Sequence, residues 1–389
     1  MKTIAIIFGG KSAEHDVSIV TAISSIIKPL ELTKRFNVEA VYVAKNGAWF
    51  WDDKLKNIDV FTSGGIEQFM AKTTPASVQF DGGMTLVKGG GLRGKRQKID
   101  VVFPSMHGTY GEDGALMGLL DMAGVPYVGC GVEASAIAMD KVTTKQIALA
   151  NGLSTSKFVY VMSEALRRGL DDAVRLADSL KFPLFVKPAH LGSSIAIAKV
   201  ANDTELRNAL EVAARYDDKI VIEEAVSNLI EVTLPIIGNH ELTPAYLEQP
   251  LLNAEDFFDF DTKYMGGGKK TGDPGAKAGG QRGAQGYSKL PSDIPQDLYQ
   301  KAEETGLAAY RALGCSGTAR VDMLINSKTG EVFVNEINPL PGSLYAHNWR
   351  QKGVSNVELV TRLVELAEER WREREQLNTV FATNFLKQF

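Results

Sequence analysis

Two carboxylates and an amide come close together in the segment ARVDMLINSKTGEVFVNEINP. Strand-like stretches flank a Ser-Lys-Thr-Gly turn, a pattern that predicts a β-hairpin. If the hairpin is symmetric about Thr329, Asp322 faces Glu336. Arg320 then faces Asn338, and all four side chains share one face because residues two apart in a strand point the same way.

This arrangement of charges needs a cation. Directly opposed Cβ atoms in a hairpin lie about 4.5–5.5 Å apart, and like charges there are destabilising. Two carboxylates with an amide oxygen suit Mg²⁺ that is shared with the phosphates of a nucleotide. Arg320 cannot bind a metal ion, but it suits an oxyanion or a phosphate in the same site. The alternative is an ordinary hairpin face with solvated charges, which the whole constellation disfavours.

A candidate phosphate-binding loop follows the strand-like stretch PLFVKP, which ends near Lys187. Gly192, Ser193 and Ser194 then offer backbone N–H groups and hydroxyls without bulky side chains. The pattern is not the P-loop motif, in which Gly-Lys-Ser/Thr follows four variable residues, and a plain turn is the alternative. Lys141 in Met-Asp-Lys is a second candidate phosphate lysine, with a solvated helix charge as its alternative reading.

Strand-like and helix-like stretches alternate in the first third of the chain, which predicts parallel α/β architecture. Apolar residues at helical spacing follow the first strand: Val17, Val20, Ile23, Ile26 and Ile27. The glycine-rich, basic stretch 86–98 is predicted to be a loop. The predicted strands are 3–8, 38–43, 99–103, 183–188, 195–200, 220–226 and 230–237.

Three later segments complete the expected organisation. A helix is predicted over 135–151, with Gly152 as its C-terminal stop. Residues 266–286 are rich in Gly, Lys and Ala without apolar periodicity, and a loop of this length in a compact chain is often a functional lid. The segment 356–371 places Val357, Val360, Leu363, Val364 and Ala367 on one helical face, which indicates core packing.

Composition excludes several classes of protein. The chain has 389 residues with 43 basic and 47 acidic side chains, a balance that argues against nucleic acid as an obligatory partner. The two cysteines, Cys130 and Cys315, have neither metal-type nor redox-type spacing, so we expect a reducing cytoplasm. No apolar run approaches the roughly 20 residues needed to span a bilayer, so no membrane partner is expected.

Six motifs then occur in a fixed order: FGGKSAEHDVS, HGTYGEDG, PYVGCGVEASAIAMDK, FVKPAHLGSS, ALGCSGTARVD and NEIN-P-LPG. Together they resemble the D-alanine–D-alanine ligases, which belong to the ATP-grasp superfamily, and they cover residues 8 to about 345. The resemblance implies a mixed α/β and α+β chain with a Rossmann-like N-terminal domain before an ATP-grasp fold. The implied domains are residues 1–127, 128–222 and 223–389.

The resemblance implies roles for residues around the first amino acid and ATP. Glu14 would hold the ammonium of the first D-alanine from the start of a helix, where a carboxylate is favoured; a simple cap is the alternative. His107 would meet that substrate's carboxylate, although a lone histidine is more often structural, and Val17 would line the same site. The residues implied for ATP are Lys141, Lys187, Ser194, Glu223, Glu224, Val226, Glu231 and Lys263.

It also implies a reaction. Asp322, Glu336 and Asn338 would carry two Mg²⁺ ions, with Mn²⁺ as a possible substitute. An acyl phosphate of the first amino acid would form, and the amine of the second would attack it. Arg320 and the backbone N–H of Gly342 would stabilise the oxyanion. Ser193 and Tyr264 would orient the reaction centre. A homodimer that serves peptidoglycan precursor synthesis, cell-wall biogenesis and cell shape is also implied.

Several positions depart from the family pattern. His347 stands where a serine meets the carboxylate of the second substrate, and Pro339 replaces a common threonine. Ala196 stands where a glycine usually follows Ser-Ser-x. The step after Glu223 is one residue shorter than usual, so that Glu231 is the candidate for the ATP ribose. The lid is longer, more basic and more glycine-rich than expected.

These departures leave three functions open. The first is a D-alanine–D-alanine ligase. The second is a related ligase with another second substrate, such as D-lactate, D-serine or another amino acid. The third is a nucleotide-binding protein without catalysis, which the intact set of Arg320, Asp322, Glu336 and Asn338 disfavours.

Overall fold

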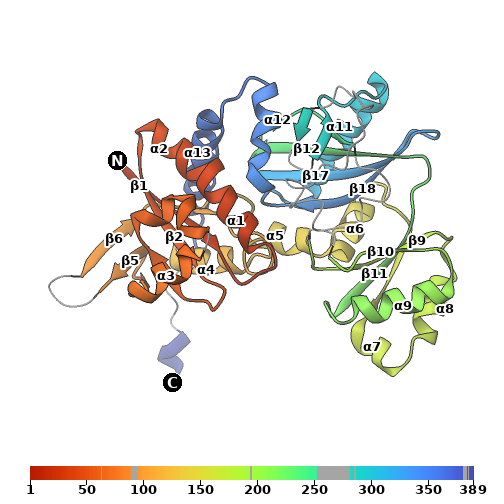
Figure 1. The fold of residues 1–389 in the computed structure, drawn as a ribbon, viewed down its shortest axis with the longest axis horizontal. Coiled ribbons are helices and arrows are strands. Elements are labelled where there is room, and N and C mark those ends of the chain that lie inside the picture. Colours follow the sequence, from red (N-terminus) through yellow and green to blue (C-terminus); the bar gives the residue numbers. More distant parts are fainter. Residues whose placement is uncertain are drawn as a thin grey trace.

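The computed structural model describes residues 1–62, 64–89, 94–192, 195–251, 281–283, 286–379, 383 and 385–389. Three four-stranded sheets follow one another along the chain and occupy separate parts of the molecule (Figure 1). The expected mixture of α/β and α+β architecture is therefore confirmed. Each of these sheets falls in one expected domain, except that β11 (Lys219–Glu224) crosses the boundary after residue 222. The domain boundaries themselves stay predictions.

The first sheet has the expected parallel core. β1 (Lys2–Gly9) lies between β2 (Phe36–Val43) and β7 (Val101–Pro104) and is parallel to both, while the short β3 (Trp49–Trp51) closes one edge in antiparallel fashion. The strand predicted over 99–103 is confirmed as β7, except that Ile99 ends β6 (Lys95–Ile99), which belongs to a different sheet. One prediction in this region was wrong. Much of the predicted loop 86–98 is a hairpin of β5 (Met84–Lys88) and β6.

The helix after β1 is not uniform. It runs as α1 (His15–Val20), a π-helical segment (Thr21–Ile27) and α2 (Lys28–Thr33). Ile23, Ile26 and Ile27 are fully buried, as their spacing predicted, but Val20 is 51% exposed. The prediction failed at Val20 because a π-helical turn holds more residues than an α-helical turn, so one spacing does not describe the whole segment.

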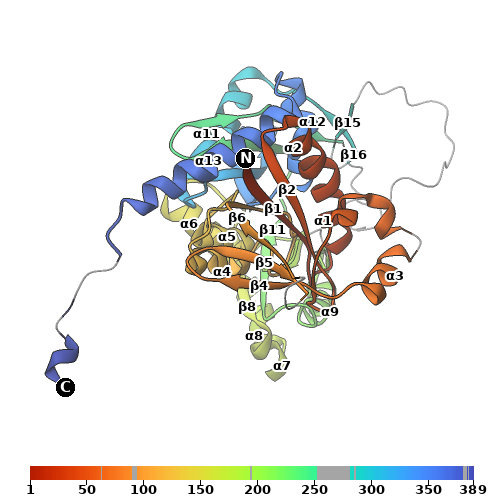
Figure 2. The ribbon, with the colours of Figure 1, turned by 90° about the vertical axis from the view of Figure 1, so that its left-hand side faces the viewer.

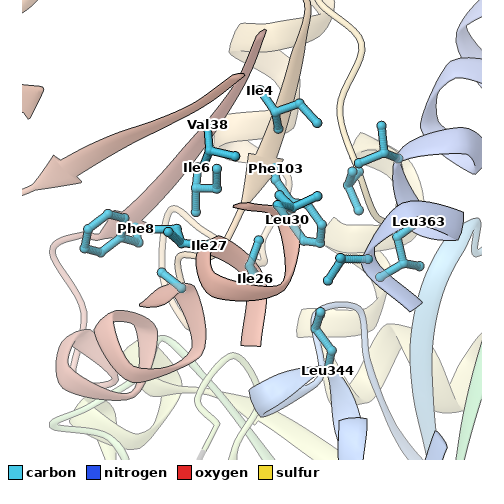
Figure 3. Close-up of a cluster of buried hydrophobic side chains, with 14 of the residues drawn as sticks. Ile4, Ile6, Phe8, Ile26, Ile27, Leu30, Val38, Phe103, Leu344 and Leu363 are labelled. Atoms are coloured by element: carbon cyan, nitrogen blue, oxygen red, sulfur yellow. The ribbon is translucent and has the colours of Figure 1, made fainter. Parts of the chain in front are cut away.

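The last long helix, α13 (Asn356–Glu375), packs against the first sheet although it is far away in sequence. Leu363 belongs to the same buried cluster as Ile4, Ile6 and Phe103 (Figure 3). The expected apolar face of α13 is confirmed, with Val360, Leu363, Val364 and Ala367 buried and Val357 half-buried. Figure 2 shows α13 running beside the N-terminal strands and the C-terminus lying away from the sheets.

The second sheet, in the order β10-β9-β11-β8, carries the strands around the phosphate-loop candidate. Its members are β8 (Phe158–Met162), β9 (Leu184–Pro188), β10 (Ala198–Val200) and β11. The single helix predicted over 135–151 is two helices, α5 (Val132–Met139) and α6 (Lys141–Ala150). The break occurs because the Asp140 side chain accepts hydrogen bonds from the N–H groups of Val142 and Thr143, which begins a new helix.

The third sheet, in the order β13-β12-β17-β18, contains the expected hairpin. β17 (Gly317–Asn326) pairs with β18 (Glu331–Asn338), and β12 (Leu229–Gly238) lies on the other side of β17. Asp322 faces Glu336 and Arg320 faces Asn338, as predicted. The predicted symmetry about Thr329 was wrong near the turn, where Asn326 faces Glu331. The register changes between Asp322 and Met323, and this bulge restores the pairing.

The remaining elements complete the described fold. No helix in the described residues is long and apolar enough to cross a membrane. Cys130 and Cys315 are both free and buried. The other elements are the 3₁₀ turns Asp53–Lys56, Ile58–Phe61, Gly342–Tyr345 and Phe385–Gln388, α3 (Gly65–Lys72), β4 (Ser77–Phe80), α4 (Ala115–Ala123), α7 (Ser163–Arg168), α8 (Asp171–Ala177), α9 (Asp203–Ala213), β13 (Leu242–Pro244), β14 (Gln249–Pro250), β15 (Gln281–Gly283), β16 (Gly286–Lys289), α11 (Gln296–Ala312) and α12 (Ala346–Gln351).

Candidate active site

The hairpin of β17 and β18 gathers charged side chains on one face. Arg320 and Asp322 are nearly fully buried, and the guanidinium donates hydrogen bonds to both carboxylate oxygens, with Nε 2.6 Å from Oδ1. The Nζ atom of Lys141 lies 3.6 Å from Oε2 of Glu336, whose side chain is 37% exposed. Asp322 and Glu336 therefore each have a cationic side chain of the protein close by.

The donor set on this face fits a divalent cation. Asp322, Glu336 and Asn338 offer only oxygen atoms as ligands and come from adjacent strands in register, which is the chemistry that Mg²⁺ prefers. The Oδ1 atom of Asn338 also accepts a hydrogen bond from the N–H of Leu340, 3.1 Å away, which fixes the direction of the amide. Glu336 and Asn338 are half-buried whereas Asp322 is buried, so two of the three donors are partly accessible to solvent.

Glu336 and Asp322 lie in one acidic row across the sheet. The row continues to Glu248, which was not predicted from the sequence. Thr233 on β12 faces Asp322, and Glu248 faces Thr233. Glu248 is 2% exposed, and its Oε2 atom lies 2.7 Å from Nε2 of His347. Burial by itself would raise the pKa of Glu248, but the hydrogen bond from His347 lowers it below its usual value. No motif includes Glu248, and only the strand pairing brings it to the site.

Lys141 connects this face with the phosphate-loop candidate. It is the first residue of α6, directly after the Asp140 cap. Its Nζ atom donates a hydrogen bond to the backbone oxygen of Leu191, 2.7 Å away, and also lies near Glu336. One ammonium group therefore lies between the loop that precedes Ser193 and the carboxylate face. The alternative reading of Lys141 as a solvated helix charge is wrong, because the residue is 7% exposed.

A buried cluster of ion pairs includes Lys187, on the strand that precedes the phosphate-loop candidate. Glu223 on β11 is 1% exposed and pairs with Lys187 and with Lys145, whose Nζ is 2.6 Å from Oε2. Ser156 also donates a hydrogen bond to Glu223 at 2.8 Å. Burial by itself would raise the pKa of Glu223, but the two ammonium groups hold it well below its usual value. Lys145 was missed, although its position four residues after Lys141 on one helix face is a signal for it.

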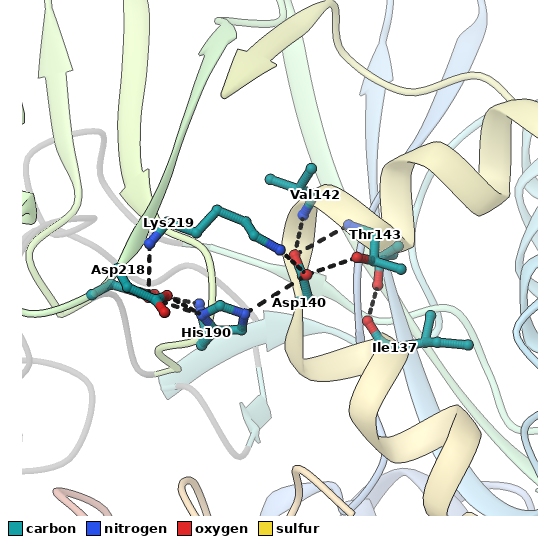
Figure 4. A network of polar contacts seen from close by, with 9 residues as sticks. Ile137, Asp140, Val142, Thr143, His190, Asp218 and Lys219 are labelled. Atoms are coloured by element: carbon teal, nitrogen blue, oxygen red, sulfur yellow. Dashed lines mark hydrogen bonds and ion pairs between the residues drawn. The ribbon is translucent and has the colours of Figure 1, made fainter. Parts of the chain in front are cut away.

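A second polar network fixes the start of the loop (Figure 4). His190 donates from Nδ1 to Oδ1 of Asp217 at 2.8 Å, and its Nε2 lies 3.7 Å from Oδ2 of Asp140. Lys219 also reaches Asp140, with Nζ 2.5 Å from Oδ2. The carboxylates of Asp140 and Asp217 raise the pKa of His190 to about 9. Sequence reasoning had no signal for this network, since its members come from three separate segments.

The same region holds the one metal-like trio of His, Cys, Asp or Glu in the described part of the chain, His190 with Asp217 and Asp218. The imidazole already pairs with three carboxylates, those of Asp140, Asp217 and Asp218. A protonated imidazole is a donor and not a metal ligand, so ion pairing accounts for this trio.

Glu14 lies between two glycine-containing loops. A Cβ atom built on Gly192 would lie 3.2 Å from Oε2 of Glu14, and one built on Gly108 would lie 2.9 Å from the same oxygen. The side chain makes no cap hydrogen bond at the start of α1, so the alternative reading as a simple cap is wrong. The structure therefore brings Glu14 to the loops that contain HGT and HLGSS. Val17 follows on the same helix and is half-buried.

His107 is buried, and both ring nitrogens have partners. Nδ1 lies 3.3 Å from Oε1 of Glu112, and Nε2 lies 3.1 Å from Oγ1 of Thr21. A carboxylate can only accept, so Nδ1 carries a proton. Burial by itself would lower the pKa of His107, but the Glu112 carboxylate raises it above its usual value. Glu112 and Thr21 therefore fix the orientation of the His107 ring before any substrate is considered.

The turn that follows β18 is strained. Ser343, Leu344 and Tyr345 have φ angles of 51°, 54° and 50°, a left-handed conformation that is unfavourable for L residues. Such strain often marks functional sites. Gly342 begins this turn, and the Tyr345 ring lies 5.0 Å from the guanidinium carbon of Arg320. Arg320 and His347 therefore both lie against Tyr345, the last residue of the turn that Gly342 begins.

Other predicted residues lie elsewhere or outside the described residues. Glu224 lies next to Glu223 in β11, and its carboxylate accepts a hydrogen bond from the N–H of Lys181, 3.0 Å away, so it is not part of the buried cluster. Val226 follows β11, and Glu231 lies on β12 opposite Leu324. Ser193, Ser194, Lys263 and Tyr264 and most of the predicted lid, 266–286, lie outside the described residues.

Two family models match most of this chain. Residues 3–130 match the family described as "D-ala D-ala ligase N-terminus", and residues 147–365 match "D-ala D-ala ligase C-terminus". The chain is 34% identical over 388 residues to D-alanine--D-alanine ligase of Acetivibrio thermocellus, covering 96% of this chain and 97% of that protein. It is 36% identical over 387 residues to D-alanine--D-alanine ligase of Chlorobium luteolum, covering 94% of this chain and 97% of that protein.

Two solved structures have similar folds. The D-alanine-D-alanine ligase from Coxiella burnetii has a TM-score of 0.77 at 26% sequence identity, with 97% of this chain and 98% of that chain covered. The VanG D-Ala:D-Ser ligase from Enterococcus faecalis has a TM-score of 0.77 at 29% identity, with 94% and 99% covered.

Proposed function

Because this chain belongs to the D-alanine–D-alanine ligase family, we propose that it joins two D-alanine molecules with the energy of ATP. The observation that carries the proposal is the face on which Arg320, Asp322, Glu336 and Asn338 lie together, with Lys141 beside it. The proposed product is D-alanyl-D-alanine, a precursor for peptidoglycan and hence for the cell wall and cell shape. We also propose a cytoplasmic homodimer.

The proposed roles divide between two groups of residues. Lys141 and Lys187 bind the phosphates of ATP, together with Ser194 and with Lys263 on the proposed lid, and Glu223, Glu224, Val226 and Glu231 serve the nucleoside. Asp322, Glu336 and Asn338 would hold two Mg²⁺ ions, or Mn²⁺ in their place. When bound, the metal would supply positive charge against the transferring phosphoryl group.

The first amino acid is held by its two charged ends. Glu14 binds the ammonium, and the carboxylate meets His107, whose two ring nitrogens are held by Glu112 and Thr21, with Val17 along the side. One carboxylate oxygen then takes the γ-phosphoryl group, which gives an acyl phosphate and ADP. Ser193 and Tyr264 orient this centre. Water must be excluded, since it would hydrolyse the acyl phosphate.

The second step needs stabilisation of negative charge. The neutral amine of the second amino acid attacks the acyl carbon, and the carbonyl oxygen becomes an oxyanion. Arg320 and the N–H of Gly342 donate to that oxygen. Inorganic phosphate leaves with the bond electrons, the amine loses a proton, and the peptide bond remains.

A second candidate function differs only in the second substrate. By sequence position, His347 stands where a serine is usual in the family, and its imidazole pairs with the buried Glu248. The fold is similar to that of a D-Ala:D-Ser ligase. An imidazole can donate to a carboxylate when protonated or can accept from a hydroxyl when neutral. A related ligase for D-serine, D-lactate or another amino acid is therefore the alternative.

One substrate panel tests both candidates. Purified full-length protein with ATP and Mg²⁺ is given D-alanine alone, and D-alanine with D-serine, D-lactate or another amino acid. Phosphate release and mass spectrometry report the products. We expect D-alanyl-D-alanine as the main product. A dominant mixed product would support the alternative, whereas no phosphate release with any mixture would contradict the proposed activity.

A further inference from the structure

Three side chains on the first helix connect the two ends of the candidate active site. Glu14, Val17 and Thr21 are separated by three and four residues, so they follow one helical face. Glu14 lies beside Gly192, next to the phosphate-loop candidate. Thr21 begins the π-helical segment and is 1% exposed. π-helical turns inside helices are frequent at functional sites, and neither the motifs nor the family resemblance gives Thr21 a role here.

The hydroxyl of Thr21 joins two parts of the chain that are far apart in sequence. The backbone N–H of Ser343 donates a hydrogen bond to Oγ1 of Thr21 over 3.1 Å. The Nε2 atom of His107 lies 3.1 Å from the same oxygen. One hydroxyl therefore contacts both the histidine proposed for the first amino acid and the strained turn that begins at Gly342.

The donors and acceptors at this hydroxyl are consistent. A threonine hydroxyl has one proton and two lone pairs. The Ser343 N–H uses one lone pair, and the Nδ1 proton of His107 points to Glu112. When His107 is neutral, the Thr21 proton is donated to Nε2; when His107 is protonated, Nε2 donates to the second lone pair. Both states keep the ring and the turn attached to Thr21.

The turn at 342–345 needs such contacts because its conformation is unfavourable in isolation. Three successive L residues in the left-handed region are rare, and surrounding contacts must hold them. One end of the turn is held by Thr21 through Ser343. The other end is held where the ring of Tyr345 lies against the guanidinium of Arg320. Loss of the Thr21 hydroxyl would remove the side-chain contact at the Ser343 end of the turn, while the packing of Leu344 and the contact of Tyr345 with Arg320 remain.

We propose that Thr21 is a positioning residue of the ligation reaction, which sets His107 and the turn at Gly342 in one fixed relation. The inference rests on the proposed function for the roles of His107 and Gly342. The side chain of Thr21 acts through these two groups, so that the bound first amino acid and the N–H that stabilises the oxyanion are aligned together.

The test uses Thr21→Val, which keeps the shape and removes the hydroxyl, and Thr21→Ser, which keeps the hydroxyl. Thr361→Val is the matched control, since Thr361 is a partly buried helical threonine on α13 that hydrogen-bonds only within its own helix in the described structure. Dipeptide synthesis is measured with KM values for D-alanine and for ATP. We expect T21V to lose 10-fold to 100-fold in kcat/KM for D-alanine, with the KM for ATP within twofold of wild type. T21S should recover to within about threefold, and T361V should match wild type.

A spectroscopic measurement makes the inference independent of activity. The ring signal of His107, assigned with His107→Gln, is followed by NMR in the full-length protein. We expect it to move in T21V and to stay in place in T361V. An unmoved His107 signal, unchanged D-alanine kinetics, or an equal loss in T21V and T21S would overturn the inference. Inactive wild-type protein with a moved His107 signal would instead contradict the proposed function and leave the Thr21 contact supported.

Discussion

The guanidinium of Arg320 donates two hydrogen bonds to the carboxylate of Asp322, with Nε 2.6 Å from Oδ1. The two residues are neighbours on one face of β17, and both are nearly fully buried. The same carboxylate is the proposed metal ligand, and the same guanidinium is the proposed oxyanion donor. The pair therefore holds a carboxylate and a guanidinium side by side, although each has a different proposed role in the reaction.

This pair predicts a strong effect of Arg320→Lys. Lysine keeps the charge but lacks the planar fork, so the contacts with Asp322 and Tyr345 are lost together. We expect kcat to fall about 10²–10³-fold, comparable to the loss of one oxyanion donor. Dipeptide synthesis measures this, and Arg362→Lys on the exposed face of α13 is the control. A wild-type rate in R320K would contradict the role of Arg320.

The buried cluster of Glu223 predicts a large loss of stability for Glu223→Gln. The change leaves Lys145 and Lys187 buried without the carboxylate that pairs with both of them, and breaking a buried pair typically costs about 3–5 kcal/mol. Denaturant unfolding measures this cost. Glu224→Gln, one residue further along on the more exposed side of the strand, should change the free energy of unfolding by less than about 1 kcal/mol. Equal effects of the two substitutions would show that burial and pairing do not decide the cost.

The same carboxylate predicts a pH effect on the acid side. Its folded-state pKa is held below the ordinary value of about 4.3 for glutamate. A lowered pKa contributes stability that is present above the unfolded-state pKa and is lost as the pH falls towards the folded-state pKa. Unfolding free energies measured from pH 6 downward should therefore fall more steeply in wild type than in E223Q.

His190 predicts the opposite pH effect. The pKa of His190 is raised to about 9 by Asp140 and Asp217, whereas the unfolded-state value is about 6.5. The contribution to stability is present in full below about pH 6.5 and is lost as the pH rises through about 9. In His190→Gln, the melting temperature should fall less between pH 6.5 and 9.5 than in wild type. His240→Gln, an exposed histidine paired with Glu373, is the control. A wild-type pH profile in H190Q would exclude this ion pairing.

Ala196 predicts a stabilising substitution. Its φ angle is 55°, in the left-handed region where the family usually has glycine. Glycine would relieve about 1–2 kcal/mol of left-handed strain in the folded protein. Its greater backbone freedom in the unfolded chain would offset about 0.5–1 kcal/mol of that gain. We expect Ala196→Gly to raise the free energy of unfolding by about 0.5–1 kcal/mol. Ala198→Gly in the neighbouring strand should lower it by a similar amount, so the difference between the two variants is the measurement.

His347 predicts a change confined to the second amino acid. His347→Ser alone would leave Glu248 buried without its imidazole partner, so the double variant H347S/E248Q is the better test. We expect an altered KM and preference for the second amino acid, with the KM for ATP within about twofold of wild type. His240→Ser is the control. A parallel loss for ATP and amino acid would indicate damage to the whole site.

The hairpin shows which facing side chains could be predicted from the sequence. The facing pairs Asp322–Glu336 and Arg320–Asn338 were predicted by counting, because residues of a regular hairpin alternate between two faces. The counting assumed symmetry about Thr329, while the observed turn is offset and a bulge between Asp322 and Met323 compensates. A bulge depends on local packing and has no clear signal in this segment.

Helix boundaries show the same limit. The apolar spacing located α13 correctly, since its buried face follows one regular period. The same reasoning missed the π-helical turn at Thr21 and the break at Asp140. A π-helical turn changes the period, and a cap is a choice between side-chain and backbone hydrogen bonds.

The sequence by itself determined which groups are available and which of them must lie together within one element: the carboxylates of the hairpin, the lysines of α6 and the alternation of the first sheet. Local geometry is sufficient for these, because strands and helices repeat over two to four residues. Only the tertiary structure decided that Glu248 joins the acidic row, that Lys145 and Lys187 share Glu223, and that Thr21 meets His107 and Ser343. These contacts join segments up to 322 residues apart, and packing of separate elements, not periodicity within one, brings them within hydrogen-bond distance.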